Sequence, residues 1–531
     1  MEKAVLFAAV IFLSAASVPG RRAAANPFEG SAAVSAPDGT GPIDKLVLAR
    51  LGRLGIKPAN VCSDAVFLRR VYLDVIGTLP TAKEAREFIQ DNSPDKRGAL
   101  IDRLLARPEF ADYWAMKWSD LLRVKAEFPI NLWPNAAELY HRWIRAGIKE
   151  NKPYDRFVRE LLTASGSNFA VPEANFYRAV QSKDPNAIAK AVTLTFMGCR
   201  MEKWPKDRQD AMASMFAQVG YKATGEWKEE IVFFDPAKAA KAGPAGPAAR
   251  TVMLPDGTKV QLAPDRDGRE VFANWLISPK NQWFARNIVN RAWCWLVGRG
   301  IIHEPDDIRP DNPPRGPELL ALLERELVAA RWDIKAVFRL ILNSRCYQLS
   351  SIPASDNPQA EAEFACYGLR RLEAEVLIDA LCQITGTTEK YTSAIPEPFT
   401  FIPEKQRSIS LADGSITSSF LEMYGRPARD TGLESERNNR PTPSQRLHLL
   451  NSSHIQRKIE QGWKIQALLR SKAAPREMVA TIYLTVLSRL PTAEELKIVG
   501  DYSTTSSAKG RDAVVDLVWA LINSTEFLYR H

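Results

Sequence analysis

Residues 72–84 read YLDVIGTLPTAKE, and residues 483–495, near the other end of the chain, read YLTVLSRLPTAEE. The two segments agree at 8 of 13 positions without a gap. In each segment an apolar helical stripe precedes Leu-Pro-Thr, and the Thr with a Glu three residues later is a capping box that begins a new helix. Farther along, RLLARPEF at 103–110 resembles ALINSTEF at 520–527. We infer a duplicated helical unit at the two ends of the chain.

Three polar positions distinguish the two copies. Arg69, Arg70 and Asp74 of the first copy correspond to Ala, Thr and Thr in the second. These side chains are therefore not needed to build the helical unit. Two interpretations stay open: they serve a binding site, or they form a solvated helix face with an ion pair between Arg70 and Asp74.

Apolar residues recur at helical spacing through most of the chain, with two exceptions. Residues 227–236, WKEEIVFFDP, predict a strand, and residues 251–262, TVMLPDGTKVQL, predict a hairpin. The low-complexity segment AKAAKAGPAGPAAR at 237–250 indicates a domain boundary. The predicted fold is mainly α, with two helical domains, a duplicated helical unit at the two ends of the chain and a small β-hairpin near the linker. The predicted divisions are a signal peptide at 1–25, a flexible lead-in at 26–40, a helical domain at 41–236, a linker and hairpin at 237–264, and a second helical domain at 265–531.

The first residues have the pattern of a secretory signal. Lys3 precedes an apolar run at 4–13, and three alanines at 23–25 supply a cleavage site of small residues. This run is too short to span a bilayer, and no later stretch is apolar enough to do so. We therefore expect an exported protein of the periplasm or cell envelope, without a transmembrane segment in the mature chain.

Composition and charge narrow the choice of partners. The chain has 45% hydrophobic and 25% charged residues, as is usual for soluble proteins, and a net charge of +9. Residues 1–25 hold three basic residues and one acidic residue, so the mature chain keeps +7. For an exported protein this positive net charge favours acidic polysaccharide, an anionic envelope surface or an acidic partner over nucleic acid.

The cysteines and histidines give no sign of a metal site. The six cysteines include no Cys-x-x-Cys, and the five histidines include no pair at helical spacing. We therefore expect no metal site, and we assign no disulfide.

The most polar stretch of the chain, residues 420–458, is the candidate ligand-binding surface. It reads FLEMYGRPARDTGLESERNNRPTPSQRLHLLNSSHIQRK, with a turn at 425–427 and a helix after Pro441. Guanidinium groups beside carboxylates are suited to hydroxyls, carboxylates and sulfate-like oxyanions. The alternative is an internal salt-bridge network that ties a long loop to the body of the protein. The predicted ligand-binding residues are Arg426, Arg429, Asp430, Glu434, Glu436, Arg437, Asn438, Arg440 and His448. Six of them are expected to line one concave polar site in the second domain: Arg426, Asp430, Glu434, Glu436, Arg437 and Arg440.

Further polar and aromatic residues carry two interpretations each. Asn287, Asn290 and Arg291 lie on an otherwise apolar helix, where they either anchor the loop at 304–317 or contact a substrate. Tryptophans are more often core residues than ligand platforms, although an exposed row of them would suit sugars. The tryptophans concerned are Trp114, Trp118, Trp133 and Trp143.

Several long motifs resemble one known family. They are FLRRVYLDVIGTLPT with RLLARPEFADYWAMKWSDLL, FARNIVNRAWCWLVGRGI with DNPPRGPELL and LILNSRCYQLS, and FLEMYGRPARDTGLESERNNRPTPSQRLHLLNSS. They resemble exported planctomycete-type proteins of unknown function that join a PSCyt-type cytochrome-associated domain to a PSD-type planctomycete-specific domain. The resemblance covers nearly all of the mature chain and implies an envelope protein, often encoded beside an exported sulfatase-like partner. It supplies no catalytic residue.

The chain departs from this family at two places. Many relatives have a Cys-x-x-Cys-His, the attachment pattern of c-type haem, where this chain reads FMGCRMEKWP and keeps only Cys199. Many also have a Cys-x-Cys where this chain has Leu433 and Ser435. The chain therefore resembles a subgroup without the haem-type Cys motif, and we expect it to bind no haem, metal or other cofactor.

Two classes of function stay open. The first is a non-catalytic exported binding or scaffolding protein that recognises acidic glycan, sulfated or uronic, or an exported sulfatase-like protein. The alternative is a metal-independent polysaccharide hydrolase or lyase that uses Asp430, Glu434 or Glu436 with Arg426 and Arg437. Two carboxylates facing each other across a cleft would favour the enzyme. An electron carrier, a third class, is disfavoured because the haem motif is missing.

Overall fold

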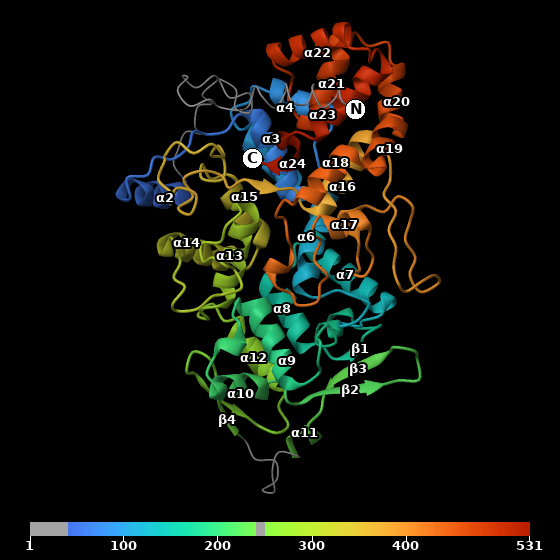
Figure 1. Ribbon diagram of the computed structural model, residues 1–531. Helices are drawn as coiled ribbons and strands as arrows, with labels where there is room; N and C mark the ends of the chain where they lie inside the picture. The colour runs from blue at the N-terminus through green and yellow to red at the C-terminus, as the bar shows by residue number, and fades with distance from the viewer. Residues whose placement is uncertain (1–40, 241–249) are drawn as a thin grey trace.

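The computed structural model describes residues 41–240 and 250–531. The predicted signal peptide and lead-in lie outside these residues, as does part of the predicted linker. Helices dominate both halves of the described chain, and the strands form only small sheets, so the predicted mainly α fold is confirmed (Figure 1). Within the two described ranges, no helix is both long and apolar enough to cross a membrane.

The first half of the chain is a succession of short helices with one small antiparallel sheet, in the strand order β1-β3-β2. Its elements are α2 (Pro42–Arg53), α3 (Asp64–Ile76), α4 (Ala82–Gln90), α5 (Lys96–Ala106), α6 (Pro108–Leu121), α7 (Pro134–Lys149), α8 (Tyr154–Thr163), β1 (Gly166–Ser167), η1 (Pro172–Tyr177), α9 (Pro185–Val192), η2 (Thr193–Met197), η3 (Met201–Lys203), α10 (Lys206–Ser214), β2 (Val219–Ala223) and β3 (Glu230–Phe234).

The second half is also helical, and only short strand pairs occur in its described part. Its elements, from the linker onward, are α11 (Ala237–Ala240), β4 (Arg250–Met253), β5 (Lys259–Leu262), α12 (Gly268–Leu276), α13 (Phe284–Val297), α14 (Pro317–Ala329), α15 (Ile334–Leu342), β6 (Arg370–Arg371), α16 (Ala374–Thr385), η4 (Ser408–Ser410), α17 (Ser419–Met423), η5 (Glu434–Glu436), α18 (Pro443–Asn451), α19 (Ser453–Gln461), α20 (Trp463–Arg470), α21 (Pro475–Leu487), α22 (Ala493–Thr505), α23 (Arg511–Ile522), α24 (Thr525–Leu528) and β7 (Tyr529–Arg530).

The predicted strand and hairpin are both present. β3 lies within the segment that predicted a strand, and β4 pairs with β5 in an antiparallel hairpin. The sequence pattern missed β2, which pairs with β3 along five residues. β2 follows directly on a helical segment and carries no turn signal before it, so its pattern did not separate it from the helices.

The duplicated helical unit is present at both ends of the chain. α3 is followed by Gly77 with φ of 58°, and α21 is followed by Ser488 with φ of 61°. Both residues therefore take the left-handed conformation that ends a helix. A Thr-Glu capping box then begins α4 in the first copy and α22 in the second. The predicted duplication is confirmed at the level of helix order and helix caps.

An arginine also joins the same two glutamates in each copy. Arg107 forms ion pairs with Glu84 and Glu109 in the first copy. In the second copy, Arg489 lies 2.7 Å from each of the two glutamates at the equivalent positions. The two arginines do not occupy equivalent positions in the sequence. The two copies therefore share a pair of glutamates neutralised by one arginine, but that arginine belongs to a different sequence position in each copy.

The two halves of the chain share one continuous hydrophobic core. Elements far apart in the sequence lie in contact: α4 with α21, α5 with α15, and α2 with α14. Strand β7, at the C-terminal end, pairs with β6 and contacts α3. In Figure 1 the blue helices α3 and α4 accordingly lie among the red helices α21, α23 and α24, and the green segments with the three-stranded sheet lie at the opposite end. The two copies of the unit thus form one end of the molecule together.

Candidate functional site

Three arginines of the predicted polar stretch, Arg426, Arg429 and Arg437, have side chains inside the protein. Arg437 Nη2 is 2.6 Å from Asp120 Oδ2, and its Nη1 is 2.6 Å from Glu375 Oε2. Its side chain is only 6% exposed. Arg429 lies 2.9 Å from the other oxygen of Asp120, and Arg426 lies 3.6 Å from Glu375. These arginines join α6 to α16, which agrees with the alternative interpretation of an internal salt-bridge network.

The charges of this network compensate one another. Burial by itself would raise the pKa of Asp120, but Arg437 and Arg429 outweigh burial and hold that pKa below its ordinary value. Burial lowers the pKa of the Arg426 guanidinium to about 10, and neighbouring Arg429 acts in the same direction. The guanidinium groups are thus neutralised by carboxylates inside the fold and are not displayed to a ligand in solution.

The three acidic residues predicted to bind a ligand, Asp430, Glu434 and Glu436, each have a separate structural partner. The carboxylate of Glu434 accepts a hydrogen bond of 3.1 Å from the indole N–H of Trp295, and burial raises its pKa. Asp430 pairs with Lys125 at 2.6 Å, and Glu436 accepts from the backbone N–H of Asp430 at 2.9 Å. None of them lines the cavities described below. Within residues 426–440 the structure has no cleft with two facing carboxylates, the arrangement expected of the hydrolase.

Three predicted residues have other positions. Asn438 and Arg440 are exposed at the surface. His448 is half-buried, with Nδ1 3.4 Å from the hydroxyl of Tyr424, and burial lowers its pKa. The structure does not bring these three together with the buried arginines at one cavity, and ligand binding by them stays a prediction.

The three polar residues that distinguish the first copy are buried, so the interpretation as a solvated face is wrong. Arg69 donates to two backbone carbonyls of the second copy, at 2.9 and 2.8 Å. Arg70 donates to the carbonyl of Tyr347 at 2.6 Å, and Asp74 accepts from the hydroxyls of Tyr347 at 2.9 Å and Tyr367 at 2.7 Å. They connect the first copy to the second half of the chain, which explains why the second copy does without them.

The polar residues of α13 act as anchors. Asn290 both donates to and accepts from the backbone of Ile302, at 2.9 and 2.8 Å. Asn287 donates to a carbonyl of η2 at 2.9 Å, and Arg291 pairs with the buried Asp306. All three residues of α13 are buried. Arg291 therefore anchors the loop at 304–317, the first of the two interpretations offered by the sequence. Asn290 anchors the residue Ile302 just before this loop, whereas Asn287 is bonded to η2.

A cleft of about 690 Å³ lies between the start of α7 and residues 398–416. Two arginines of the polar stretch make hydrogen bonds to the backbone of residues that line this cleft. Arg426 donates to the carbonyl of Asp413 at 3.2 Å, and Arg429 donates to the carbonyl of Ala412 at 2.8 Å. Arg426 and Arg429 thus hold the wall in place without lining it. We call this the Asp413 cleft, and its polar and aromatic lining residues are Asn135, Glu138, His141, Arg142, Arg145, Phe399, Thr400, Phe401, Gln406, Ser410 and Asp413.

The Asp413 cleft contains buried oxygen atoms that lack a partner. Asp413 is 3% exposed. Its Oδ1 accepts from the backbone N–H groups of Ala126 and Ser415, both at 2.8 Å. Its Oδ2, like the hydroxyl of Thr400, has no hydrogen-bond partner among the described residues. A buried acceptor without a partner is costly, so a ligand hydroxyl group that reached either atom would supply a missing hydrogen bond.

An aromatic row extends the cleft at the surface. It consists of Trp227, Trp133, Phe399 and Phe401; the Trp133 ring centroid lies 5.4 Å from that of Phe399 and 6.3 Å from that of Trp227. Three of the four are exposed, and Trp133 is half-buried. The φ of Trp133 is 77°, an unfavourable conformation for a residue other than glycine. Lys228 lies 5.6 Å from the Trp133 ring centroid and adds a positive charge to the row.

Sequence reasoning found only part of this site. It named Trp133 among four tryptophans, of which Trp114 and Trp118 are buried core residues. Residues 386–419 are rich in Thr, Ser and Pro, a composition typical of a connecting loop. The run PFTFIP at 398–403, with aromatic residues between prolines, is the signal that could have indicated an exposed aromatic surface.

No group of three potential metal-ligating side chains occurs in residues 41–240 and 250–531.

The geometry defines a mainly helical protein whose two halves are joined by buried ion pairs and whose surface carries an aromatic cleft. Residues 42–219 match the family model PSCyt2, a protein of unknown function (DUF1549). Residues 268–503 match the family model PSD1, a protein of unknown function (DUF1553). The chain therefore belongs to the planctomycete-type family in which a PSCyt2 domain precedes a PSD1 domain. Comparison with curated proteins and with solved structures gave no match.

Proposed function

We propose that this chain is an exported, non-catalytic binding protein of the cell envelope that recognises acidic glycan, sulfated or uronic, in the Asp413 cleft. The observation that carries this proposal is the aromatic row beside an unpartnered, buried carboxylate oxygen. Aromatic faces pack against the apolar faces of sugar rings, and Asp413 accepts from sugar hydroxyls. Arg142 and Arg145 line the same cleft, where they pair with Glu138 and Asp112, and their remaining N–H groups supply donors for sulfate or uronate groups.

Two other candidates have less support. An exported sulfatase-like protein as partner rests on the family resemblance alone. A metal-independent hydrolase or lyase needs an acid and a base that face the substrate. The carboxylates at 430, 434 and 436 are instead engaged with Lys125, Trp295 and backbone groups.

Binding of the purified mature chain to an array of sulfated and uronic-acid oligosaccharides tests the proposal. Trp227→Ala and Asp413→Asn should each weaken binding by about tenfold, since each removes one part of the recognition. Trp463→Ala is the matched control, because Trp463 is 63% exposed, against 67% for Trp227, and belongs to α20, outside the cleft. Its binding should equal that of the unaltered chain.

The proposal fails if no acidic oligosaccharide binds, or if Trp227→Ala and Asp413→Asn bind as well as Trp463→Ala does. Release of new reducing ends or unsaturated products during the assay would support the hydrolase or lyase instead. Export is tested separately by cell fractionation and N-terminal sequencing. An exported product should begin near Asn26, and an intact Met1 on a cytoplasmic product would contradict export.

A further inference from the structure

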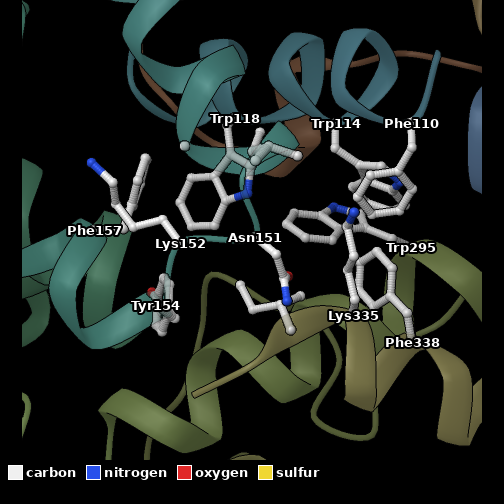
Figure 2. Close-up of a pocket in the computed structure, with 13 residues that line it drawn as sticks. Phe110, Trp114, Trp118, Asn151, Lys152, Tyr154, Phe157, Trp295, Lys335 and Phe338 are labelled. Atoms are coloured by element: carbon white, nitrogen blue, oxygen red, sulfur yellow. The ribbon is translucent and has the colours of Figure 1, made fainter. Parts of the chain in front are cut away.

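A second, smaller pocket lies where the two halves of the chain meet, and the proposed glycan site does not use it. Seven aromatic side chains line it, from α6 and α8 of the first half and from α13 and α15 of the second. Figure 2 shows Trp114 and Trp118 of α6 on one side, with Lys335 and Phe338 of α15 on the other. Apolar pockets between domains are common sites for small ligands. We call this the aromatic pocket.

Two of the three indole N–H groups of the pocket, those of Trp114 and Trp295, donate to other parts of the protein. The Trp114 indole N–H donates to the carbonyl of Val75 at 3.0 Å, and that of Trp295 donates to Glu434 at 3.1 Å. These bonds fix the two rings in place. They leave the ring faces as apolar walls of the pocket.

Three other polar groups of the pocket are unused. The hydroxyl of Tyr154, a residue 1% exposed, has no hydrogen-bond partner among the described residues. The side-chain amide of Asn151 and the ammonium group of Lys335 also make no hydrogen bond or ion pair within the described ranges. Lys152, which lines the same pocket, is by contrast engaged with Glu160. Each of these three groups is able to donate a hydrogen bond, and the ammonium group of Lys335 has no acceptor atom, so the pocket offers several donors to an acceptor.

The environment of Lys335 favours an anionic acceptor. Its Nζ lies 4.7 Å from the Phe110 ring centroid. Burial lowers the pKa of Lys335, and Arg339 acts in the same direction while Asp333 opposes them. A carboxylate beside the ammonium group would replace the hydration that burial removes.

The size of the pocket limits the ligand. Its volume of about 50 Å³ has room for about four water-sized groups. We propose that the aromatic pocket binds a short-chain aliphatic carboxylate, whose hydrocarbon end packs between the aromatic rings and whose carboxylate accepts from Lys335 and the neighbouring donors. An acid of about two or three carbon atoms, with four or five non-hydrogen atoms, comes closest to this volume.

Titration of the purified mature chain with sodium propanoate and with propanamide tests this inference. Binding is followed by tryptophan fluorescence, to which Trp114, Trp118 and Trp295 report directly. Propanoate should bind at least about tenfold more tightly than propanamide, because the two differ in charge at nearly the same size. Lys335→Met keeps the apolar stem over Phe110 and should remove this preference. Lys83→Met, at a side chain that is 83% exposed, is the matched control and should keep it.

Equal binding of propanoate and propanamide, an unchanged preference in Lys335→Met, or no saturable change in fluorescence would each overturn the inference. The comparison of the two ligands uses the unaltered chain, so it stays decisive if a variant fails to fold. Lys335→Met should bind acidic oligosaccharides like the unaltered chain. Failure at the aromatic pocket and failure at the Asp413 cleft are therefore distinguishable.

Discussion

Arg437 is the residue whose replacement most directly tests the internal ion-pair network. Its guanidinium group makes hydrogen bonds of 2.6 and 3.0 Å to Glu375 and one of 2.6 Å to Asp120. In Arg437→Ala, Asp120 keeps Arg429 at 2.9 Å, whereas Glu375 keeps only Arg426 at 3.6 Å. Leaving a buried carboxylate with so distant a partner costs about 3–5 kcal/mol. Urea denaturation followed by tryptophan fluorescence measures this loss in the free energy of unfolding.

Arg440→Ala is the matched control, because Arg440 belongs to the same stretch and is exposed. It should change the free energy of unfolding by less than about 0.5 kcal/mol. Adding Glu375→Gln to Arg437→Ala should recover part of the loss, because the uncompensated charge is then gone. The reasoning is refuted if Arg437→Ala costs less than about 1 kcal/mol while abolishing ligand binding, since that result would place Arg437 at a binding surface.

Three further predictions follow from the fold and the sequence. Arg489→Ala should cost about 3 kcal/mol in the same urea assay, because the buried Glu526 and its neighbour Glu495 lose their shared cation. Burial lowers the pKa of His141 to about 3, so the folded protein excludes a proton that the unfolded chain binds below about pH 6.5. Through this residue the free energy of unfolding should fall by about 2 kcal/mol from pH 8 to pH 5, and His141→Gln should remove that part of the slope. Finally, the denatured protein should show no haem absorption band, because the chain has no Cys-x-x-Cys-His; a surviving band would contradict the sequence argument.

The sequence by itself determined the local structure of this protein. The Leu-Pro-Thr segments with their capping glutamates predicted where α4 and α22 begin, and the segment TVMLPDGTKVQL at 251–262 predicted the β4–β5 hairpin. Helix caps, apolar periodicity and turn residues act between neighbours in the chain, so their signals are contained in short segments. The same locality allowed the duplicated unit to be recognised from two segments far apart.

Only the tertiary structure decided which polar side chains meet water. Arg437 and the exposed Arg440 belong to one polar stretch, but Arg437 meets Asp120, 317 residues away in the sequence. Likewise, Phe399 and Trp133 form one aromatic row because distant segments converge there. The type of a residue determines which bonds its side chain is able to make. The partner and the burial of that side chain depend on how remote segments pack. For that reason the sequence indicated a polar stretch but not that its arginines support, from inside the fold, the wall of a cleft formed by other residues.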